Sequence, residues 1–397
     1  MQDYREYKRK NMQNTGTSGK ARTRKKAKKA KLSSYVLTYL FIMLTFGTPI
    51  VSYVTGVDKD AKNTENRTKA TFDAVKAAKY VDVAEKFDEY YNDNLPLRST
   101  IINTWSGLKF SIFGEIKSNN VISGKADGSK AKTWLFYEAD SDHNPVRTAT
   151  GIDQYPDTIK QALDIGIETN TKNAKLNNVK LYYMFAPNKE NIYKDKLPSS
   201  ILIKDRESGL DKYIKSSKYE NLLYAKDVLE GHLAENIYFR QDTHWNDYGA
   251  YLAFAQLMSK IEPSYDTSAY SVEVKEKNAD NRDLAQMCGI VGGFKDDIPI
   301  VHYRDQDSFS IMNDADKKYL VSENPDAPIN QTLLIIGDSY REYMIDYFRK
   351  TYTRVIDIHR GNYKPSYFAD IKANVVIIES VERYASETSE IRVFENN

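Results

Sequence analysis

Five short runs of apolar, mostly β-branched residues recur between residues 179 and 379 of this chain. They are Val179–Phe185, Leu222–Tyr224, Thr332–Ile336, Arg354–Ile358 and Val375–Glu379. Strands that read as nearly continuous apolar runs are buried on both faces, which requires helices on both sides of the sheet. The stretches between the runs are long enough to supply those helices. The sequence therefore predicts an α/β fold with a doubly wound parallel sheet.

Ser339 stands at the end of one of these runs. The run ending at Ile336 continues as Gly337-Asp338-Ser339 and then enters a predicted helix over residues 340–349. In such sheets ligands bind outside the carboxyl ends of the strands, where a hydroxyl can act as a nucleophile and its own N–H can help to hold an oxyanion. The alternative is ordinary turn and helix-cap chemistry. We expect Asp338 to be structural, because it should point away from its neighbour.

A second polar segment, Tyr238–Asn246, precedes an amphipathic helix that runs to Ile261. In an extended segment residues two apart point the same way, so Asp242 and His244 should project together. A neutral imidazole is a competent base, and a carboxylate fixes its tautomer. Alternatively, His244 caps the helix or satisfies a core contact. A metal site is the third interpretation, but no further ligand stands at a recognisable spacing, and we expect no metal.

Together these segments supply a serine, a histidine and a carboxylate, each placed at the end of an element. Ser339, His244 and Asp242 therefore predict a Ser/His/Asp site for acyl transfer. The chain has one cysteine, Cys288, which excludes a disulfide framework and a cysteine zinc cluster, and we expect it to be a buried small apolar residue.

A run of 26 residues without charge, 32–57, lies near the N-terminus. At about 1.5 Å per helical residue it is long enough to cross a hydrocarbon core of roughly 30 Å. Eight Lys and Arg residues lie between Lys20 and Lys31, which predicts a cytoplasmic N-terminus and an extracytoplasmic body. A cleaved signal peptide is the alternative for the run, and nucleic-acid binding is the alternative for the basic residues.

The charge distribution supports this division. Residues 1–31 carry a net charge of +10, whereas the remaining 45 basic and 53 acidic residues give −8. Apolar residues between Phe72 and Tyr90 recur at helical spacing. We therefore predict a basic cytoplasmic tail, a single transmembrane helix, a juxtamembrane linker with an amphipathic helix, and an extracytoplasmic catalytic domain. These parts span 1–31, 32–57, 58–94 and 95–397.

The two polar segments also resemble a known family. YFRQDTHWNDYGAYLAF followed by LLIIGDSYREYM is similar to the SGNH-hydrolase-like O-acetyltransferases of the AlgJ/AlgX type and to the related DHHW-family proteins. Further similar blocks extend the resemblance over roughly residues 87–383. It implies an SGNH-hydrolase-like fold, with Ser339 as nucleophile, His244 as base and Asp242 as the acid that orients it. Thr243 stands where the DHHW name would put a second histidine.

The resemblance and the positions after strands also suggest residues that bind substrate or the oxyanion. Arg240 and Trp245 share the histidine's signature, although core packing is an equal alternative for Trp245. Ordinary turn positions are the alternative for Asn188 and Asn362. The candidates for this role are Arg240, Trp245, Tyr340, Arg341, Asn188 and Asn362.

The implied function is transfer of acetyl groups to hydroxyls of a secreted or cell-surface polysaccharide through an acyl-serine. The resemblance implies a multipass membrane-bound O-acyltransferase as the donor partner. We expect no cofactor and no nucleic-acid partner. A single-pass anchor in the cell membrane would hold the site near donor and polymer. Two alternatives remain: a carbohydrate acetyl esterase with the same triad, and a non-catalytic polysaccharide-binding assembly protein.

Overall fold

The computed structural model describes residues 35–43, 70–93, 98–118, 120–139, 143–290, 293–304 and 309–395. Contacts divide the chain into two compact units, Met1–Ile102 and Asn103–Asn397. The predicted tail, and residues 32–34 and 44–57 of the predicted membrane span, lie outside the described residues. Residues 35–43 are helical and exposed. No helix among the described residues combines the length and apolar character that crossing a bilayer requires.

In the first unit the predicted amphipathic helix is split in two. Helix α3 spans Phe72–Ala77 and helix α4 spans Val83–Asp93. Thr71 begins α3 by accepting a hydrogen bond from Ala74 N, and the helix ends because Ala78 takes an extended conformation. The carboxylate of Asp93 then accepts a hydrogen bond from Ala70 N, which closes the pair.

The second unit contains a seven-stranded sheet in the order β5-β4-β12-β10-β11-β9-β8. The five predicted runs all form strands, and these five are mutually parallel. They are β4 (Lys180–Ala186), β5 (Leu222–Tyr224), β10 (Ile329–Gly337), β11 (Tyr352–His359) and β12 (Val375–Val381). The prediction of a wholly parallel sheet is wrong at one edge, where β8 (Ser310–Asp314) and β9 (Tyr319–Glu323) pair antiparallel.

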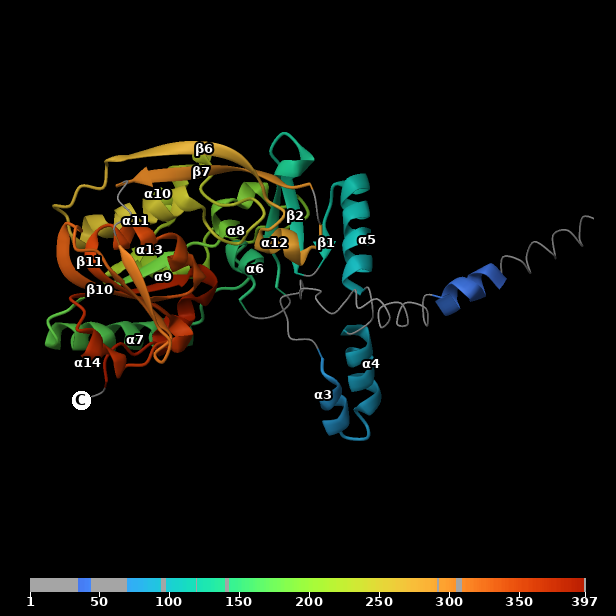
Figure 1. The fold of residues 1–397 in the computed structure, drawn as a ribbon, viewed down its shortest axis with the longest axis horizontal. Helices are drawn as coiled ribbons and strands as arrows, with labels where there is room; N and C mark the ends of the chain where they lie inside the picture. The colour runs from blue at the N-terminus through green and yellow to red at the C-terminus, as the bar shows by residue number, and fades with distance from the viewer. Residues whose placement is uncertain are drawn as a thin grey trace, which may run out of the picture. The chain divides into compact units, whose positions relative to one another are not determined.

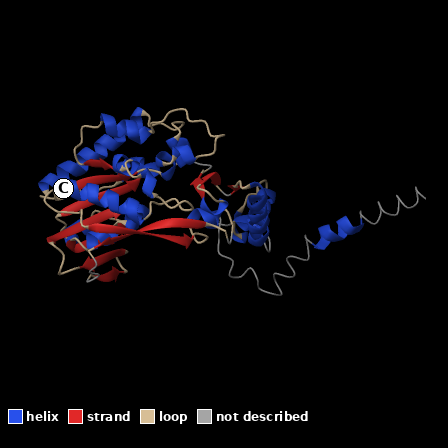
Figure 2. Cartoon of the chain, turned by 90° about the horizontal axis from the view of Figure 1, so that it is seen from above, coloured by secondary structure: helices blue, strands red, loops and turns tan. Residues whose placement is uncertain are grey.

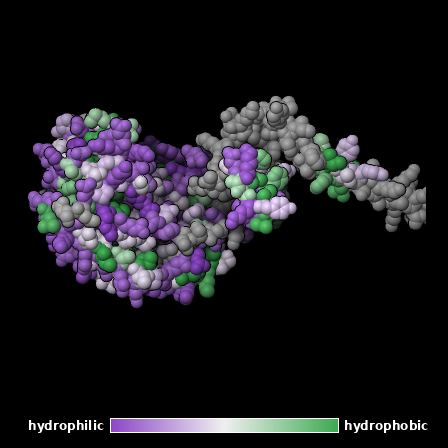
Figure 3. All heavy atoms as spheres, turned by 90° about the horizontal axis from the view of Figure 1, so that it is seen from below, coloured by the Kyte–Doolittle hydropathy of each residue, from purple (hydrophilic) through white to green (hydrophobic). Residues whose placement is uncertain are grey.

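Helices cover both faces of this sheet, as a doubly wound sheet requires (Figures 1 and 2). One face packs on α11 and α13, and the other on α7, α9 and α14. These helices span Asp247–Ile261 (α11), Ile345–Arg349 (α13), Asp157–Leu176 (α7), Gly209–Ser216 (α9) and Tyr367–Ile371 (α14). Two buried apolar clusters result, and the outer surface seen in Figure 3 is mostly hydrophilic.

A smaller antiparallel sheet has its own apolar cluster, in which Phe110 of helix α5 contacts Phe294. Its strands are β1 (Lys117–Ser118), β2 (Val121–Ala126) and β3 (Thr133–Tyr137), and α5 spans Arg98–Phe113. A two-stranded hairpin of β6 (Tyr270–Asn278) and β7 (Lys295–Tyr303) packs on α11.

Short helical elements complete the unit. The α-helices are α6 (Pro145–Ala149), α8 (Lys189–Ile192), α10 (Lys226–Glu230) and α12 (Asp283–Met287). The 3₁₀ turns are η2 (Lys130–Lys132), η3 (Lys194–Lys196), η4 (Leu233–Glu235), η5 (Ser339–Tyr343), η6 (Arg360–Asn362) and η7 (Glu382–Glu390). The helix predicted over residues 340–349 is therefore divided between η5 and α13.

Candidate active site

Ser339 is the first residue of η5, directly after the buried end of the central strand β10. Asp338 precedes it as the cap. One carboxylate oxygen accepts from Tyr340 N at 3.0 Å and the other accepts from Val381 N at 2.8 Å, which ties β10 to the neighbouring strand. Asp338 thus takes up hydrogen bonds from the backbone, and Ser339 remains half-buried at the sheet's carboxyl edge.

The turn before Ser339 depends on a close approach between Gly337 and Glu379 of β12. A Cβ atom on Gly337 would lie 2.5 Å from Oε2 of Glu379 and 2.9 Å from its Cβ. That same Oε2 accepts a hydrogen bond from Asp338 N at 3.0 Å. Burial, together with the nearby charge of Asp338, raises the pKa of Glu379 well above its usual value. A neutral carboxyl therefore supports the turn, and only glycine fits beside it.

His244 lies on a tight hairpin loop and not on the extended strand end that the sequence predicts. Tyr238 and Trp245 form an isolated antiparallel bridge, and Phe239 N donates to His244 O at 3.3 Å. The ammonium group of the fully buried Lys189 donates to three carbonyls of this loop. The carboxylate of Asp242 also accepts from His244 N, so the loop's turn brings the two side chains together.

Asp242, His244 and Ser339 form one chain of hydrogen bonds. Oδ1 of Asp242 lies 2.7 Å from Nδ1 of His244, and Nε2 of His244 lies 2.7 Å from Oγ of Ser339. The serine and the histidine are 95 residues apart in the sequence. The juxtaposition expected from the two polar segments is therefore present, with the imidazole between a carboxylate and a hydroxyl.

Asp283, at the start of α12, is a second carboxylate that the sequence does not reveal. It accepts hydrogen bonds from Thr243 N at 2.9 Å and from Thr243 Oγ1 at 2.6 Å. Its Oδ2 lies 3.9 Å from Nδ1 of His244. The only sequence signal is an acidic residue before a short apolar stretch, which is too common to identify it.

The two carboxylates have opposite pKa shifts. Burial favours the neutral form of Asp242, but the hydrogen bond from His244 and the charge of His244 outweigh it and lower the pKa of Asp242 to about 2. Burial and the negative charge of Asp242 raise the pKa of Asp283 to about 6. Asp242 is therefore the permanently charged partner of the imidazole, and Asp283 titrates near neutrality.

These three groups also have the composition of a metal site. One ligand atom from each of Asp242, His244 and Asp283 lies within 4.8 Å of the others. Asp283 supplies a third possible ligand, which no spacing in the sequence predicts. However, both oxygens of Asp283 accept hydrogen bonds from Thr243, and Nδ1 of His244 is at hydrogen-bond distance from Asp242. These groups therefore form a hydrogen-bond network that can hold and transfer a proton.

Tyr340 and Trp245 connect the serine turn to the histidine loop. The hydroxyl of Tyr340 donates to Thr243 O, and Nε1 of Trp245 donates to Tyr340 O at 3.0 Å. Both side chains are fully buried. Their burial favours the core-packing alternative for Trp245 and places Tyr340 inside the domain, so both side chains position the site from within. Tyr343 is half-buried instead, and its ring centroid lies 5.4 Å from that of His244.

The two predicted arginines are buried in ion pairs. Nε of Arg240 lies 2.9 Å from Asp127 and its Nη1 lies 2.5 Å from Asp296. Nε of Arg341 lies 2.6 Å from Asp357, and its Nη1 donates to Asp338 O at 2.6 Å. Their donors are directed to internal partners, so both have structural positions, unlike the substrate contacts predicted for them.

The two predicted asparagines differ in accessibility. Asn188 follows β4 and is fully buried, with its Oδ1 accepting from Arg383 Nη1 at 3.3 Å and its N donating to Glu382. This burial argues against an open oxyanion site at Asn188. Asn362 ends η6 after β11 and is half-buried, so it remains a candidate.

Two cavities open among segments that follow strands at this edge of the sheet. A cavity of about 420 Å³ is lined by residues after β12 and around α6, including His143, Arg147 and Arg383. A second, of about 610 Å³, is lined by residues after β11, including His359 and Arg360. Because His359 pairs with Gly337 in the sheet, this second cavity begins beside the serine's own strand.

Comparison with known proteins identifies relatives of this domain. A family model described as an SGNH hydrolase-like domain of the acetyltransferase AlgX matches residues 130–348, which include every residue of the hydrogen-bonded chain. A curated relative, a probable alginate O-acetylase AlgJ from Azotobacter vinelandii, is 27% identical over 190 residues. The match covers 46% of this chain and 43% of that protein, so the chain spans less than half of its relative's length.

Solved structures share the fold. PatB1 of Bacillus cereus superposes with a TM-score of 0.52 at 17% identity, over 70% of this chain and all of that one. A second structure of PatB1, with a sulfonyl adduct, gives 0.50 at the same identity, over 68% of this chain and 97% of that one. At this level of identity the likeness is one of fold, and it agrees with the expected SGNH-hydrolase-like α/β architecture.

Proposed function

Because the chain belongs to the family of SGNH hydrolase-like domains of the AlgX acetyltransferase type, we propose that it is an O-acetyltransferase that acts on hydroxyls of a secreted or cell-surface polysaccharide. The observation that carries the proposal is the hydrogen-bond chain from Asp242 through His244 to Ser339. The name of the curated relative, a probable alginate O-acetylase, supports a polysaccharide as acceptor.

The first half-reaction loads the serine. Nε2 of His244 takes the proton of Ser339 as Oγ attacks the acetyl carbonyl, and Asp242 stabilises the imidazolium that forms. The backbone N–H of Ser339, at the start of η5, is the oxyanion donor that we propose. The tetrahedral intermediate then collapses, the leaving group takes the proton from the imidazolium, and acetyl-Ser339 remains.

The second half-reaction unloads it. Nε2 of His244 now removes a proton from a sugar hydroxyl, whose oxygen attacks the acetyl-serine carbonyl. Collapse of the second intermediate returns the proton to Oγ of Ser339 and releases the acetylated sugar. We propose that the acceptor lies along the cavities beside His359 and Arg383, because both flank the carboxyl edge where the serine stands.

A membrane anchor is part of the arrangement that we propose. We propose that residues 32–57 anchor the chain, with the basic residues before them on the cytoplasmic side and the catalytic unit outside the cell. A multipass membrane-bound O-acyltransferase would then supply acetyl across the bilayer. Extraction of membranes with alkaline carbonate tests this arrangement: an anchored chain stays in the pellet, and release into the supernatant contradicts it.

The decisive test compares polymer acetylation in a strain that lacks the gene. The wild-type chain should restore the acetyl content of the polysaccharide, and Ser339→Ala should not. Ser259→Ala, an exposed serine on α11, is the matched control and should behave as the wild type. Full acetylation by Ser339→Ala, at equal protein level, would exclude the acyl-serine and favour a non-catalytic assembly role.

A reaction with purified components separates transfer from hydrolysis. The full chain is incubated with p-nitrophenyl acetate and an oligosaccharide acceptor, and the products are analysed by mass spectrometry. An acetylated oligosaccharide that requires Ser339 supports the transferase. Release of acetate alone, with the acceptor unchanged at saturating concentration, would instead identify an esterase.

A further inference from the structure

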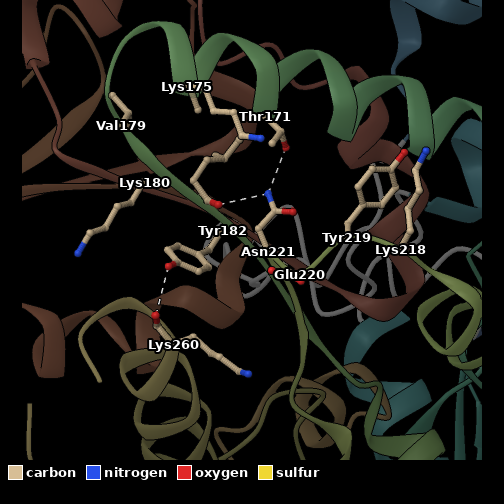
Figure 4. Close-up of a pocket in the computed structure, with 12 residues that line it drawn as sticks. Thr171, Lys175, Val179, Lys180, Tyr182, Lys218, Tyr219, Glu220, Asn221 and Lys260 are labelled. Carbon is tan, nitrogen blue, oxygen red and sulfur yellow. Dashed lines mark hydrogen bonds between the residues drawn. The ribbon is translucent and has the colours of Figure 1, made fainter. Parts of the chain in front are cut away.

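A groove of about 850 Å³ lies at the amino end of the sheet, where β4 and β5 begin (Figure 4). Its lining comes from helix α7 on one side, from the end of α11 on the other, and from residues 218–221 before β5. The volume is in the range of cavities that hold ligands of several rings. The groove uses none of the residues of the candidate active site.

The groove is rich in lysine. Lys175, Lys180, Lys218 and Lys260 line it, against the single acid Glu220. This composition contrasts with the chain after residue 31, in which acidic residues outnumber basic ones by 53 to 45. A local excess of positive charge on an acidic body attracts anions to this groove.

Two of the four lysines form ion pairs, and no partner is recorded for the other two among the described residues. Nζ of Lys180 lies 2.6 Å from Glu262, and Nζ of Lys218 lies 2.8 Å from Glu168. Lys175 and Lys260 are exposed on opposite walls. Their ammonium groups are therefore the strongest candidates to meet an incoming anion.

The floor is built to present neutral polar and aromatic groups. Nδ2 of Asn221 donates to Thr171 Oγ1 and to Leu181 O, both at 3.2 Å, which fixes the amide across the floor. The hydroxyl of Tyr182 donates to Lys260 O at 3.2 Å, so the half-buried ring is also fixed. A fixed ring beside an amide and flexible cations suits a sugar, which has apolar ring faces and many hydroxyls.

The groove is distant from the triad. Strand β4 begins at Lys180 in the groove and ends at Ala186, on the edge where the serine stands. Seven residues at about 3.3 Å each separate the two edges by roughly 20 Å. A ligand in the groove therefore cannot react at Ser339, although a long polymer can reach both places.

We propose that this groove is an accessory binding site for an acidic polysaccharide, with Lys175 and Lys260 contacting its carboxylates or phosphates. The inference rests on the proposed function for the identity of the ligand as the polymer that is acetylated. A second attachment point roughly 20 Å from the serine would keep the polymer at high effective concentration through successive transfers.

The test measures binding of an oligogalacturonate to the full chain by calorimetry. The double variant Lys175→Glu/Lys260→Glu should bind at least about fivefold more weakly, because two attractive contacts become repulsive. Lys125→Glu/Lys277→Glu, on exposed positions of β2 and β6, makes the same change in net charge and should bind as the wild type. Added salt should weaken wild-type binding, and the methyl-esterified oligomer should bind far less.

The outcomes separate this inference from the proposed function. Ser339→Ala should keep wild-type binding, and the double lysine variant should keep wild-type hydrolysis of p-nitrophenyl acetate. Equal binding by the double variant and the wild type, equal loss in the control variant, or equal affinity for the esterified oligomer would each overturn the groove assignment. Loss of acetyl transfer in every preparation, with groove-dependent binding intact, would overturn the proposed function alone.

Discussion

Oδ2 of Asp283 lies 3.9 Å from Nδ1 of His244, the nitrogen that is already hydrogen-bonded to Asp242. The histidine therefore has two carboxylates on the side that faces away from the serine. Their pKa values are about 2 and about 6, so only Asp283 changes its charge near neutral pH. This second carboxylate therefore gives the site a titration of its own.

Removing this charge should change the pH dependence of the reaction. Asp283 gains its negative charge as the pH rises through about 6, so the charge beside Nδ1 of His244 changes in this range. In Asp283→Asn, the part of the kcat/KM profile that follows the ionisation of Asp283 near about pH 6 should be lost. Hydrolysis of p-nitrophenyl acetate from about pH 4 to about pH 9 measures it, a range that includes the pKa of about 6 of Asp283. Asp316→Asn, in the turn between β8 and β9, is the matched control.

Asp283→Asn should also change how the stability of the folded chain depends on pH. The pKa of Asp283 is higher in the folded chain than in the unfolded chain, so its contribution is fully present below the unfolded value of about 4 and is lost as pH rises through about 6. Asp283→Asn should not show this loss. Melting temperatures at acidic and neutral pH measure the difference, and parallel curves for wild type and variant would contradict the assigned shift.

Asp242→Asn should affect catalysis far more than Asp283→Asn. The asparagine keeps the size of the side chain, but it cannot accept the Nδ1 proton as a charged partner, so the base loses its tautomer and its imidazolium loses support. We expect kcat to fall by about 10³- to 10⁴-fold. Single-turnover measurement of acetyl-Ser339 formation by mass spectrometry checks this. A loss of less than about tenfold, equivalent to about 1.4 kcal/mol in the barrier, would remove Asp242 from the mechanism.

Gly337→Ala should destabilise the domain. The added Cβ would overlap Oε2 of Glu379, and Glu379 cannot withdraw without losing Asp338 N. Overpacking of this kind costs about 1–3 kcal/mol. Chemical denaturation gives the value. Glu379→Gln is the informative control: because burial keeps this carboxyl neutral, the isosteric amide should be tolerated better than Glu379→Ala.

Tyr340→Phe tests the connection between the serine turn and the histidine loop. The variant removes the hydroxyl that donates to Thr243 O and leaves the ring's packing against Trp245. We expect a loss of about 1 kcal/mol in stability and a drop of about three- to tenfold in kcat, with KM little changed. Steady-state kinetics and denaturation together decide it, and a change confined to KM would indicate a substrate contact instead.

The sequence predicted the strands of the main sheet because their runs are buried on both faces. Val375–Glu379 is apolar through its first four residues, and the strand formed there is wholly buried. The antiparallel edge escaped prediction because Ser310–Asp314 is short and exposed over most of its length, so no burial pattern marks it. Membership of the AlgJ/AlgX type of family was predicted correctly from the two polar segments.

The chain from Asp242 through His244 to Ser339 was predictable because each of these residues directly follows or precedes a strand or helix that the sequence indicates. Their catalytic roles stay predictions. The ion pairs of Arg240 could not be predicted, because its partners Asp127 and Asp296 are 113 and 56 residues away and no local pattern links them. Asp283 was missed for two reasons. Its contact with Thr243 spans 40 residues, and the helix that Asp283 begins has only one turn.

The residues that hold the serine turn in place are separate from the surface segments that line the cavities beside it. This separation affects how the domain can be modified. The serine turn is fastened to the next strand and to the histidine loop by Asp338, Glu379 and Tyr340. The cavities beside it are walled by surface segments, such as the one that begins at His359. On the proposed function, replacing these surface segments with their counterparts from related proteins should change the acceptor that is used. The chain from Asp242 through His244 to Ser339 should stay intact, because the hydrogen bonds that hold the serine turn do not involve these segments.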